Sequence, residues 1–135
     1  MRISECVVFL IVRDGCVLVE RRKLSKLLLP GVIAIPGGGI EADETPLAAT
    51  RREVFEELNL VVADAQPICT LLDRTGLEEI GEARRLHYFW ISEWSGEFQV
   101  HEADEILWVR LDELAQLILH VDRLAITEYL RLYHH

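Results

Sequence analysis

The sequence predicts an α/β fold in which a mixed β-sheet lies between helices. Short runs rich in β-branched residues recur along the chain, and two longer segments have apolar residues at helical spacing. Two helices among several strands favour a layered sheet over a barrel or a bundle. At 135 residues, half of them hydrophobic, the chain is the size of one ordinary domain with its own core. We therefore expect residues 1–135 to form a single domain.

The first half of the chain predicts a hairpin, a further strand and a helix. Residues 5–22 contain two β-branched runs joined by Asp14-Gly15, a dipeptide that favours the positive φ values of a tight turn. Residues 31–35 are expected to form another strand, which ends before the glycines of the next loop. Thr45 is then the N-cap of a helix that has Pro46 at its first position and ends near Leu58. Asn59 follows, and it tolerates the left-handed conformation that ends a helix.

The second half predicts three more strands and a last helix. The expected strands are Ile68–Leu72, Leu86–Glu93 and Ile106–Leu111. Residues 73–85 are polar and contain glycine, which indicates a mobile loop. Residues 112–132 have helical periodicity with a break near His120. Strand alternation places Tyr88 and Trp90 on one face of their strand and Phe89 on the other.

Composition excludes several classes of partner. The chain has 23 acidic and 14 basic residues and a formal net charge of -9, which argues against binding a nucleic acid polymer or an anionic membrane. Three cysteines match neither a disulfide framework nor a zinc site, so we expect reduced thiols and a cytoplasmic protein. No apolar stretch has the length of a membrane span. A ligand that carries phosphate would need local cations or a metal.

The helix expected after Pro46 has one acidic face. Glu53, Glu56 and Glu57 fall within an arc of about 100° on that face, opposite the apolar residues. Like charges at this spacing destabilise a helix by a few tenths of a kcal/mol unless a cation neutralises them. Magnesium prefers carboxylate oxygens and bridges to substrate phosphates. A magnesium site is one interpretation, and a solvated acidic surface is the other.

The residues around this face resemble the signature of the Nudix hydrolase family. The matching positions are Gly38, Glu44, Arg52, Glu53, Val54, Glu56, Glu57 and Leu60. Asn59 stands where the family pattern has glycine. The resemblance implies a Nudix-type α/β/α sandwich with a mixed β-sheet. It also implies a hydrolase of nucleoside diphosphates linked to another moiety, with Mg²⁺ or Mn²⁺ as cofactor.

The resemblance also assigns roles to residues. Glu53, Glu56, Glu57 and the backbone carbonyl of Gly37 would hold the metal. Arg52 would orient these carboxylates, and Glu44 would brace the turn into the helix or act only on the helix dipole. A general base must lie near the attacking water, and the choice among Glu53, Glu102 and Glu105 stays open, with Glu105 the preferred loop residue.

The densest basic cluster suggests where phosphates bind. Arg21, Arg22 and Lys23, with Lys26 close by, lead into the strand before the glycines, and together with Gly38 they are expected to contact substrate. The alternative is a solubilising edge on the hairpin.

The expected substrate is a small nucleotide. No proline follows Pro67, where ADP-ribose hydrolases of this family have one, and the turn at residues 94–97 resembles that of MutT-type triphosphatases. The resemblance therefore implies a MutT-like enzyme that converts a nucleoside triphosphate to a monophosphate and pyrophosphate. A nucleotide sugar, a dinucleoside polyphosphate or nucleotide sensing without turnover are the alternatives. The oligomeric state stays open, with a homodimer among the expectations.

Overall fold

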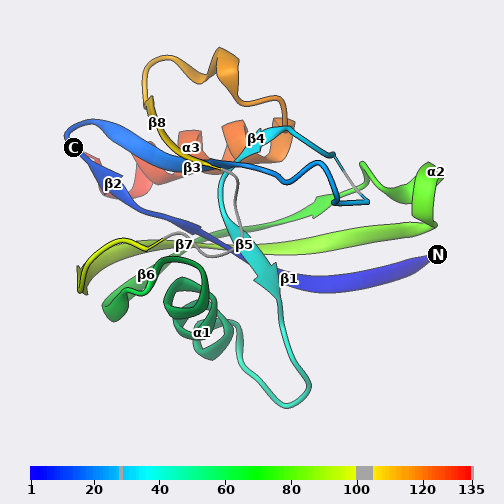
Figure 1. Cartoon of the computed structure of the whole chain (residues 1–135), viewed down its shortest axis with the longest axis horizontal. Coiled ribbons are helices and arrows are strands. Elements are labelled where there is room, and N and C mark those ends of the chain that lie inside the picture. The colour runs from blue at the N-terminus through cyan, green and yellow to red at the C-terminus, as the bar shows by residue number, and fades with distance from the viewer. Residues whose placement is uncertain (28, 100–104, 135) are drawn as a thin grey trace.

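The computed structural model describes residues 1–27, 29–99 and 105–134, which form two β-sheets and the helices that pack on them (Figure 1). The strands are β1 (Arg2–Leu10), β2 (Val12–Arg13), β3 (Cys16–Arg21), β4 (Ile33–Ala34), β5 (Gly37–Gly39), β6 (Val61–Asp73), β7 (Glu82–Ser95) and β8 (Glu105–Arg110). The helices are α1 (Pro46–Leu58), α2 (Leu77–Ile80), α3 (His120–Tyr133) and the 3₁₀ helix η1 (Leu114–Gln116).

The larger sheet is mixed and lies between layers. Its strand order is β5-β1-β7-β6, with β1 parallel to β7 and the other pairs antiparallel. The smaller sheet has the order β2-β3-β4, with β8 also paired to β3. Helices α1 and α3 cover opposite sides of the larger sheet (Figure 1). The predicted fold class, an α/β sandwich with a mixed sheet, is confirmed.

Two apolar clusters hold these layers together. On the α1 side, Val54 and Leu58 of the helix pack with Phe9 and Ile91 of the sheet. On the α3 side, the cluster contains Tyr88 with the helix residues Ala125, Ile126 and Tyr129. Tyr88 and Trp90 therefore face α3 while Phe89 faces α1, as strand alternation predicted.

The expected hairpin is correct at its tip and wrong along its length. Asp14 and Gly15 have φ values of 53° and 75°, and they join β2 to β3 in an antiparallel pair. However, the first run is interrupted at Ile11. The residues before it form β1, which belongs to the larger sheet and pairs with β5 and β7. The apolar run before Asp14 thus contributes β1 to the larger sheet and β2 to the smaller one.

Helix α1 forms for the local reasons seen in the sequence. The Thr45 hydroxyl accepts a hydrogen bond of 3.1 Å from the Ala48 N–H, and Pro46 occupies the first position. The helix ends at Leu58, and Asn59 has a left-handed conformation with φ of 61°. Asn59 thus adopts the conformation for which the family pattern uses glycine.

Two other expectations need correction, and the predicted break near His120 is confirmed. Residues 73–85 do not form a mobile loop, because β6 and β7 extend into them and α2 lies between. Asp73 is buried, and Arg84 donates to it at 2.6 Å. The strand expected at 31–35 is only the two residues of β4. The last helical segment is divided into η1 and α3, so the helix proper begins at the predicted break, His120.

The cysteines and the helices of the described residues bear on the expectations from composition. Cys6, Cys16 and Cys69 are all free and half-buried. Among the described residues, every helix is too short or too polar to cross a lipid bilayer.

Candidate active site

The glycines of β5 allow the backbone to approach both β1 and α1 closely. A Cβ atom on Gly37 would lie 2.1 Å from the carbonyl oxygen of Val7, so this position in the sheet requires glycine. A Cβ atom on Gly38 would lie 2.2–2.4 Å from the atoms of the Glu53 carboxylate. The absence of a side chain at Gly38 therefore keeps open the space beside that carboxylate.

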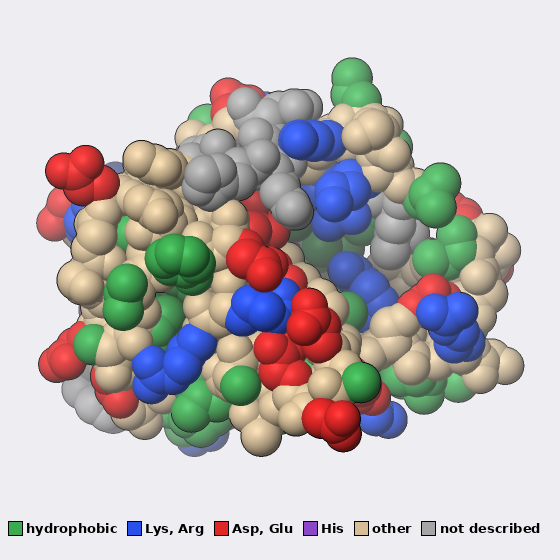
Figure 2. All heavy atoms as spheres, turned by 60° about the horizontal axis from the view of Figure 1, so that its bottom comes forward, with side chains coloured by type: hydrophobic (Ala, Val, Ile, Leu, Met, Phe, Trp, Pro, Cys, Tyr) green, Lys and Arg blue, Asp and Glu red, His purple; other side chains and the backbone are tan. Residues whose placement is uncertain are grey.

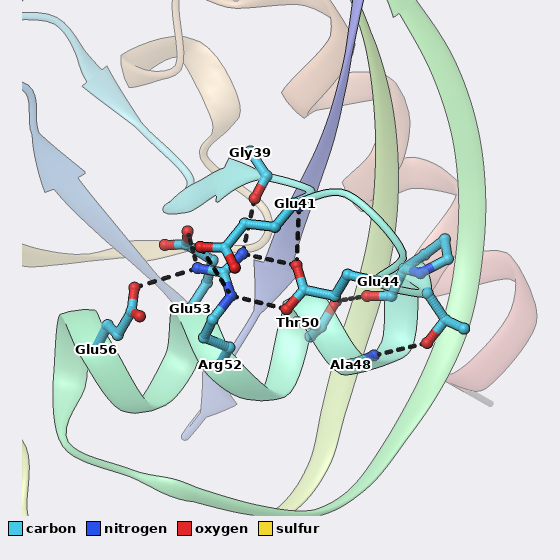
Figure 3. Close-up of polar contacts among 10 residues, drawn as sticks. Gly39, Glu41, Glu44, Ala48, Thr50, Arg52, Glu53 and Glu56 are labelled. Atoms are coloured by element: carbon cyan, nitrogen blue, oxygen red, sulfur yellow. Dashed lines mark hydrogen bonds and ion pairs between the residues drawn. The ribbon is translucent and has the colours of Figure 1, made fainter.

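Arg52 joins the three segments that build the site (Figure 3). Its Nη1 donates to Glu53 at 2.8 Å and to Glu56 at 3.2 Å. Its Nη2 donates to the Gly39 carbonyl at 2.8 Å and to Glu44 at 2.9 Å, and its Nε donates to Glu44 at 2.8 Å. One guanidinium thus holds α1, β5 and the loop before the helix. These contacts are those of a positioning residue, and that role stays a prediction.

Glu44 fixes the turn that leads into α1. Hydrogen bonds from Arg52, supported by the Glu41 N–H, lower the pKa of Glu44 to about 2, so it is ionised at neutral pH. The same bonds raise the pKa of Arg52. Of the two roles considered for Glu44, the bracing role matches these contacts, because its side chain is paired with Arg52 and the Glu41 backbone.

A cavity of about 240 Å³ lies between α1, β5 and β3, and we call it the carboxylate cavity. Its wall consists of Glu20, Arg22, Lys23, Lys26, Gly37, Gly38, Gly39, Glu53 and Glu57. Glu57 is 6% exposed, whereas Glu56, at 54%, lies outside this wall. Acidic and basic side chains gather beside a hollow on this face of the molecule (Figure 2). The cavity therefore combines carboxylates with facing cations.

The structure divides the predicted substrate-binding residues into two groups. Arg22, Lys23 and Gly38 line the carboxylate cavity. Arg21 points elsewhere, since it donates to Glu105 at 2.5 Å and to the Gly31 carbonyl at 3.2 Å. Neither Arg21 nor Glu105 lines the cavity, so the geometry gives no support to their predicted roles in binding and proton transfer. Glu102 lies outside the described residues.

A second cavity, of about 200 Å³, continues from the first into the molecule, and we call it the inner cavity. The two share Glu20, Arg22, Lys26 and the three glycines of β5. The inner cavity then extends to Arg84, Leu86, Leu119 and Asp122. Together they form a continuous recess that is acidic and basic at its mouth and more apolar inside.

Asp122 is a buried acid at the inner end of this recess. Its carboxylate accepts hydrogen bonds from the Tyr88 hydroxyl at 2.7 Å and from the Ile35 N–H at 3.1 Å. Burial raises the pKa of Asp122 to about 6, although these two hydrogen bonds act in the opposite direction. Asp122 thus connects α3 to β7 and to the link between β4 and β5, beside the cavity.

The sequence reasoning missed Glu20 and Asp122. Strand alternation could have indicated Glu20, because it lies two residues before Arg22 and so shares its face of the strand. Asp122 could have been noticed as a carboxylate on the apolar face of α3, between Val121 and Ala125. Neither belongs to a local motif.

The residues present fit a magnesium or manganese ion. Glu53, Glu56, Glu57 and the Gly37 carbonyl offer oxygen atoms, which these cations prefer, and Gly38 leaves space beside Glu53. Within residues 1–27, 29–99 and 105–134, no three acidic, histidine or cysteine side chains are already grouped as a metal site. Arg52 instead holds Glu53 and Glu56. Each of these bonds uses one oxygen of the carboxylate, so the other oxygen of Glu53 and of Glu56 could contact a cation while Arg52 holds the side chain.

Comparison with known proteins identifies the family. The family model described as NUDIX domain matches residues 1–130. The chain therefore belongs to the Nudix hydrolase family, as the signature indicated.

Three relatives illustrate the similarity. A crystal structure of a MutT NUDIX hydrolase from Burkholderia pseudomallei has a TM-score of 0.83 and 27% identity, with 95% of this chain and 98% of that chain covered. The CTP pyrophosphohydrolase of Escherichia coli K12 is 28% identical over 86% of this chain and 82% of its own length. The 8-oxo-dGTP diphosphatase of Haemophilus influenzae is 32% identical, but the match spans only 57% of this chain and 54% of that protein.

Proposed function

We propose that the protein hydrolyses a nucleoside triphosphate to a nucleoside monophosphate and pyrophosphate, with Mg²⁺ or Mn²⁺ as cofactor. The observation that carries this proposal is the carboxylate cavity, in which Glu53 and Glu57 face the cations Arg22, Lys23 and Lys26 across the glycine strand β5. The relatives named as a CTP pyrophosphohydrolase and an 8-oxo-dGTP diphosphatase support a nucleotide substrate.

The chain's own residues supply binding and orientation. Arg22, Lys23 and Lys26 contact phosphate oxygens, which explains how a protein of net charge -9 holds a polyphosphate. Glu53, Glu56, Glu57 and the Gly37 carbonyl hold the divalent cation, which when bound polarises the phosphoryl group and activates water. Arg52 keeps the carboxylates in position through its contacts with Gly39 and Glu44.

The reaction is a displacement at phosphorus. Water forms a new P–O bond, the P–O bond to the leaving pyrophosphate breaks, and a proton leaves the water. Glu53 is the favoured base, because it lines the cavity, whereas Glu105 is paired with Arg21 outside it. No covalent intermediate is required.

The location in the cell is part of the proposal. Three free cysteines match a reducing compartment, so we expect the protein to act in the cytoplasm.

The test is product analysis with Mg²⁺ or Mn²⁺ across nucleoside triphosphates, nucleotide sugars and dinucleoside polyphosphates. We expect monophosphate and pyrophosphate from at least one triphosphate. Glu53→Gln and Glu57→Gln should each lose most of this activity and remain folded by circular dichroism. Glu79→Gln makes the same charge change on the exposed helix α2 and is the matched control. If every class of substrate stays intact, the enzymatic proposal is wrong, and nucleotide sensing without turnover becomes the favoured alternative.

Near-normal turnover in both glutamine variants would disprove the assignment of the metal site. A preference for a nucleotide sugar or a dinucleoside polyphosphate would instead correct the substrate class and leave that assignment in place.

A further inference from the structure

The wall shared by the two cavities contains an acid that the proposed chemistry does not use. Glu20 lies on β3 and lines both the carboxylate cavity and the inner cavity. Its neighbours on that shared wall are Arg22, Lys26 and the glycines of β5. Any ligand that begins at Glu53 and Glu57 and extends toward Asp122 must pass Glu20.

The order of groups in a nucleotide matches the order of the two cavities. The polyphosphate belongs beside the basic residues and Glu57, in the carboxylate cavity. The base, which has apolar faces and polar edges, suits the inner cavity, whose wall adds Leu86 and Leu119 to the polar side chains of Arg84 and Asp122. The sugar joins phosphate to base, so it would lie at the shared wall, next to Glu20.

The chemistry of a carboxylate selects the same part of the ligand. An ionised carboxylate only accepts hydrogen bonds, and it repels phosphate oxygens. A group that lies against Glu20 with favourable energy must therefore be a donor. The hydroxyls of a sugar are such donors, and an acidic residue on a ribose hydroxyl is a recurrent arrangement in dinucleotide-binding folds.

We propose that Glu20 is a specificity-determining residue that accepts a hydrogen bond from a sugar hydroxyl of the bound nucleotide. This inference rests on the proposed function and goes beyond it, because it names the part of the substrate that the protein distinguishes. The relatives leave the matter open, since one is named for a deoxynucleotide and another for a ribonucleotide.

A purely structural role for Glu20 is the competing explanation. Burial and the nearby Arg84 lower the pKa of Arg22, while the charges of Glu20 and Glu57 act in the opposite direction, so Glu20 also stabilises the charge of Arg22 electrostatically. If that were its only role, replacing Glu20 would weaken phosphate binding for every nucleotide to the same degree. A ratio between substrates that differ only in their hydroxyls distinguishes the two roles.

The experiment measures kcat/KM for four nucleotides with one base: the ribonucleotide and its 2′-deoxy, 3′-deoxy and 2′,3′-dideoxy forms. The wild-type protein should favour the ribonucleotide over the dideoxy form by about 10-fold or more, the value of a hydrogen bond to a charged group. Glu20→Ala should bring this ratio close to one, and Glu20→Gln, which can still accept a hydrogen bond, should give an intermediate ratio. Glu79→Gln should keep the wild-type ratio.

The outcomes separate this inference from the proposed function. If triphosphates are hydrolysed but the wild-type protein treats all four sugars alike, or Glu20→Ala keeps the wild-type ratio, the inference is wrong and the function stands. An equal loss of kcat/KM for all four substrates in Glu20→Ala would show that Glu20 acts only by supporting Arg22. That outcome would also refute the inference. If no nucleotide is hydrolysed, the proposed function fails and the inference fails with it.

Discussion

Replacing Asp122 with asparagine should change how the stability of the fold depends on pH. Asp122 is 2% exposed and accepts hydrogen bonds from Tyr88 and Ile35. Asparagine has nearly the same size, can form hydrogen bonds at both positions and does not ionise. The variant therefore removes the titration of this buried acid with little change in packing.

The expected sign follows from the direction of the shift. Burial raises the pKa of Asp122 from its ordinary 3.8 to about 6, so the folded protein binds this proton more tightly than the unfolded chain. The stability that protonated Asp122 contributes is complete below about pH 4 and is lost as the pH rises through about 6. A difference of about two pH units corresponds to about 3 kcal/mol. The unfolding free energy of wild type minus variant should thus fall by about 3 kcal/mol between pH 3 and pH 7.

Urea unfolding at several pH values would measure this difference. Tryptophan fluorescence is a suitable signal, because Trp90 packs against Tyr129 and Tyr133 with ring centroids 5.3 Å and 5.0 Å apart. Acids whose pKa is lowered, such as Glu44 and Asp73, are present in both proteins and cancel in the subtraction. Curves for the two proteins that run parallel within about 0.5 kcal/mol would refute the reasoning.

Asp112→Asn is the control for this measurement. Asp112 is exposed, and its hydrogen bonds with Arg110 lower its pKa. Its contribution to stability is present above the ordinary pKa and is lost as the pH falls through the lowered value. The difference between wild type and this variant should therefore change in the opposite direction with pH.

Three further predictions concern the active site and its helix. Gly38→Ala should lower kcat/KM by about 10-fold to 100-fold, because its Cβ atom would displace the Glu53 carboxylate. Gly39→Ala is the control: its Cβ atom meets nothing within 4 Å, so its kcat/KM should fall far less. Thr45→Ala removes the N-cap of α1 and should cost about 1 kcal/mol, seen as a fall in melting temperature of about 4 °C, and an unchanged melting temperature would contradict the capping role. Removing divalent cations with EDTA should abolish hydrolysis and leave the circular dichroism spectrum of the folded protein; activity that persists after exhaustive chelation would show that no metal is needed.

Local signals made α1 and its acidic face predictable. The cap at Thr45, the proline after it and the turn at Asn59 each act within a few residues, so the sequence determines both ends of the helix. The spacing of the glutamates then follows from the helical period. For the same reason, the tip of the first hairpin was correct.

Long-range contacts decided the parts that sequence reasoning missed. No pattern within residues 5–22 predicts that β1 pairs with β7, about 80 residues away, instead of continuing in the hairpin. Residues 73–85 were interpreted as a loop because they are polar, yet Asp73 and Arg84 neutralise each other across a strand pair. Glu20 and Asp122 come together only when β3 and α3 enclose one recess. Their proximity depends on how the helix and the sheets pack, and a short stretch of sequence does not predict that packing.

The five hydrogen bonds of Arg52 have a consequence for the protein before it meets any ion. A guanidinium that cannot lose its charge at neutral pH is a permanent counter-ion for the acidic surface of α1. If the protein binds a divalent cation as proposed, these carboxylates do not need that cation in order to be neutralised in the folded state. Under the proposed function, removing magnesium or manganese would then stop hydrolysis while the fold of α1 and its glycine loop stays intact.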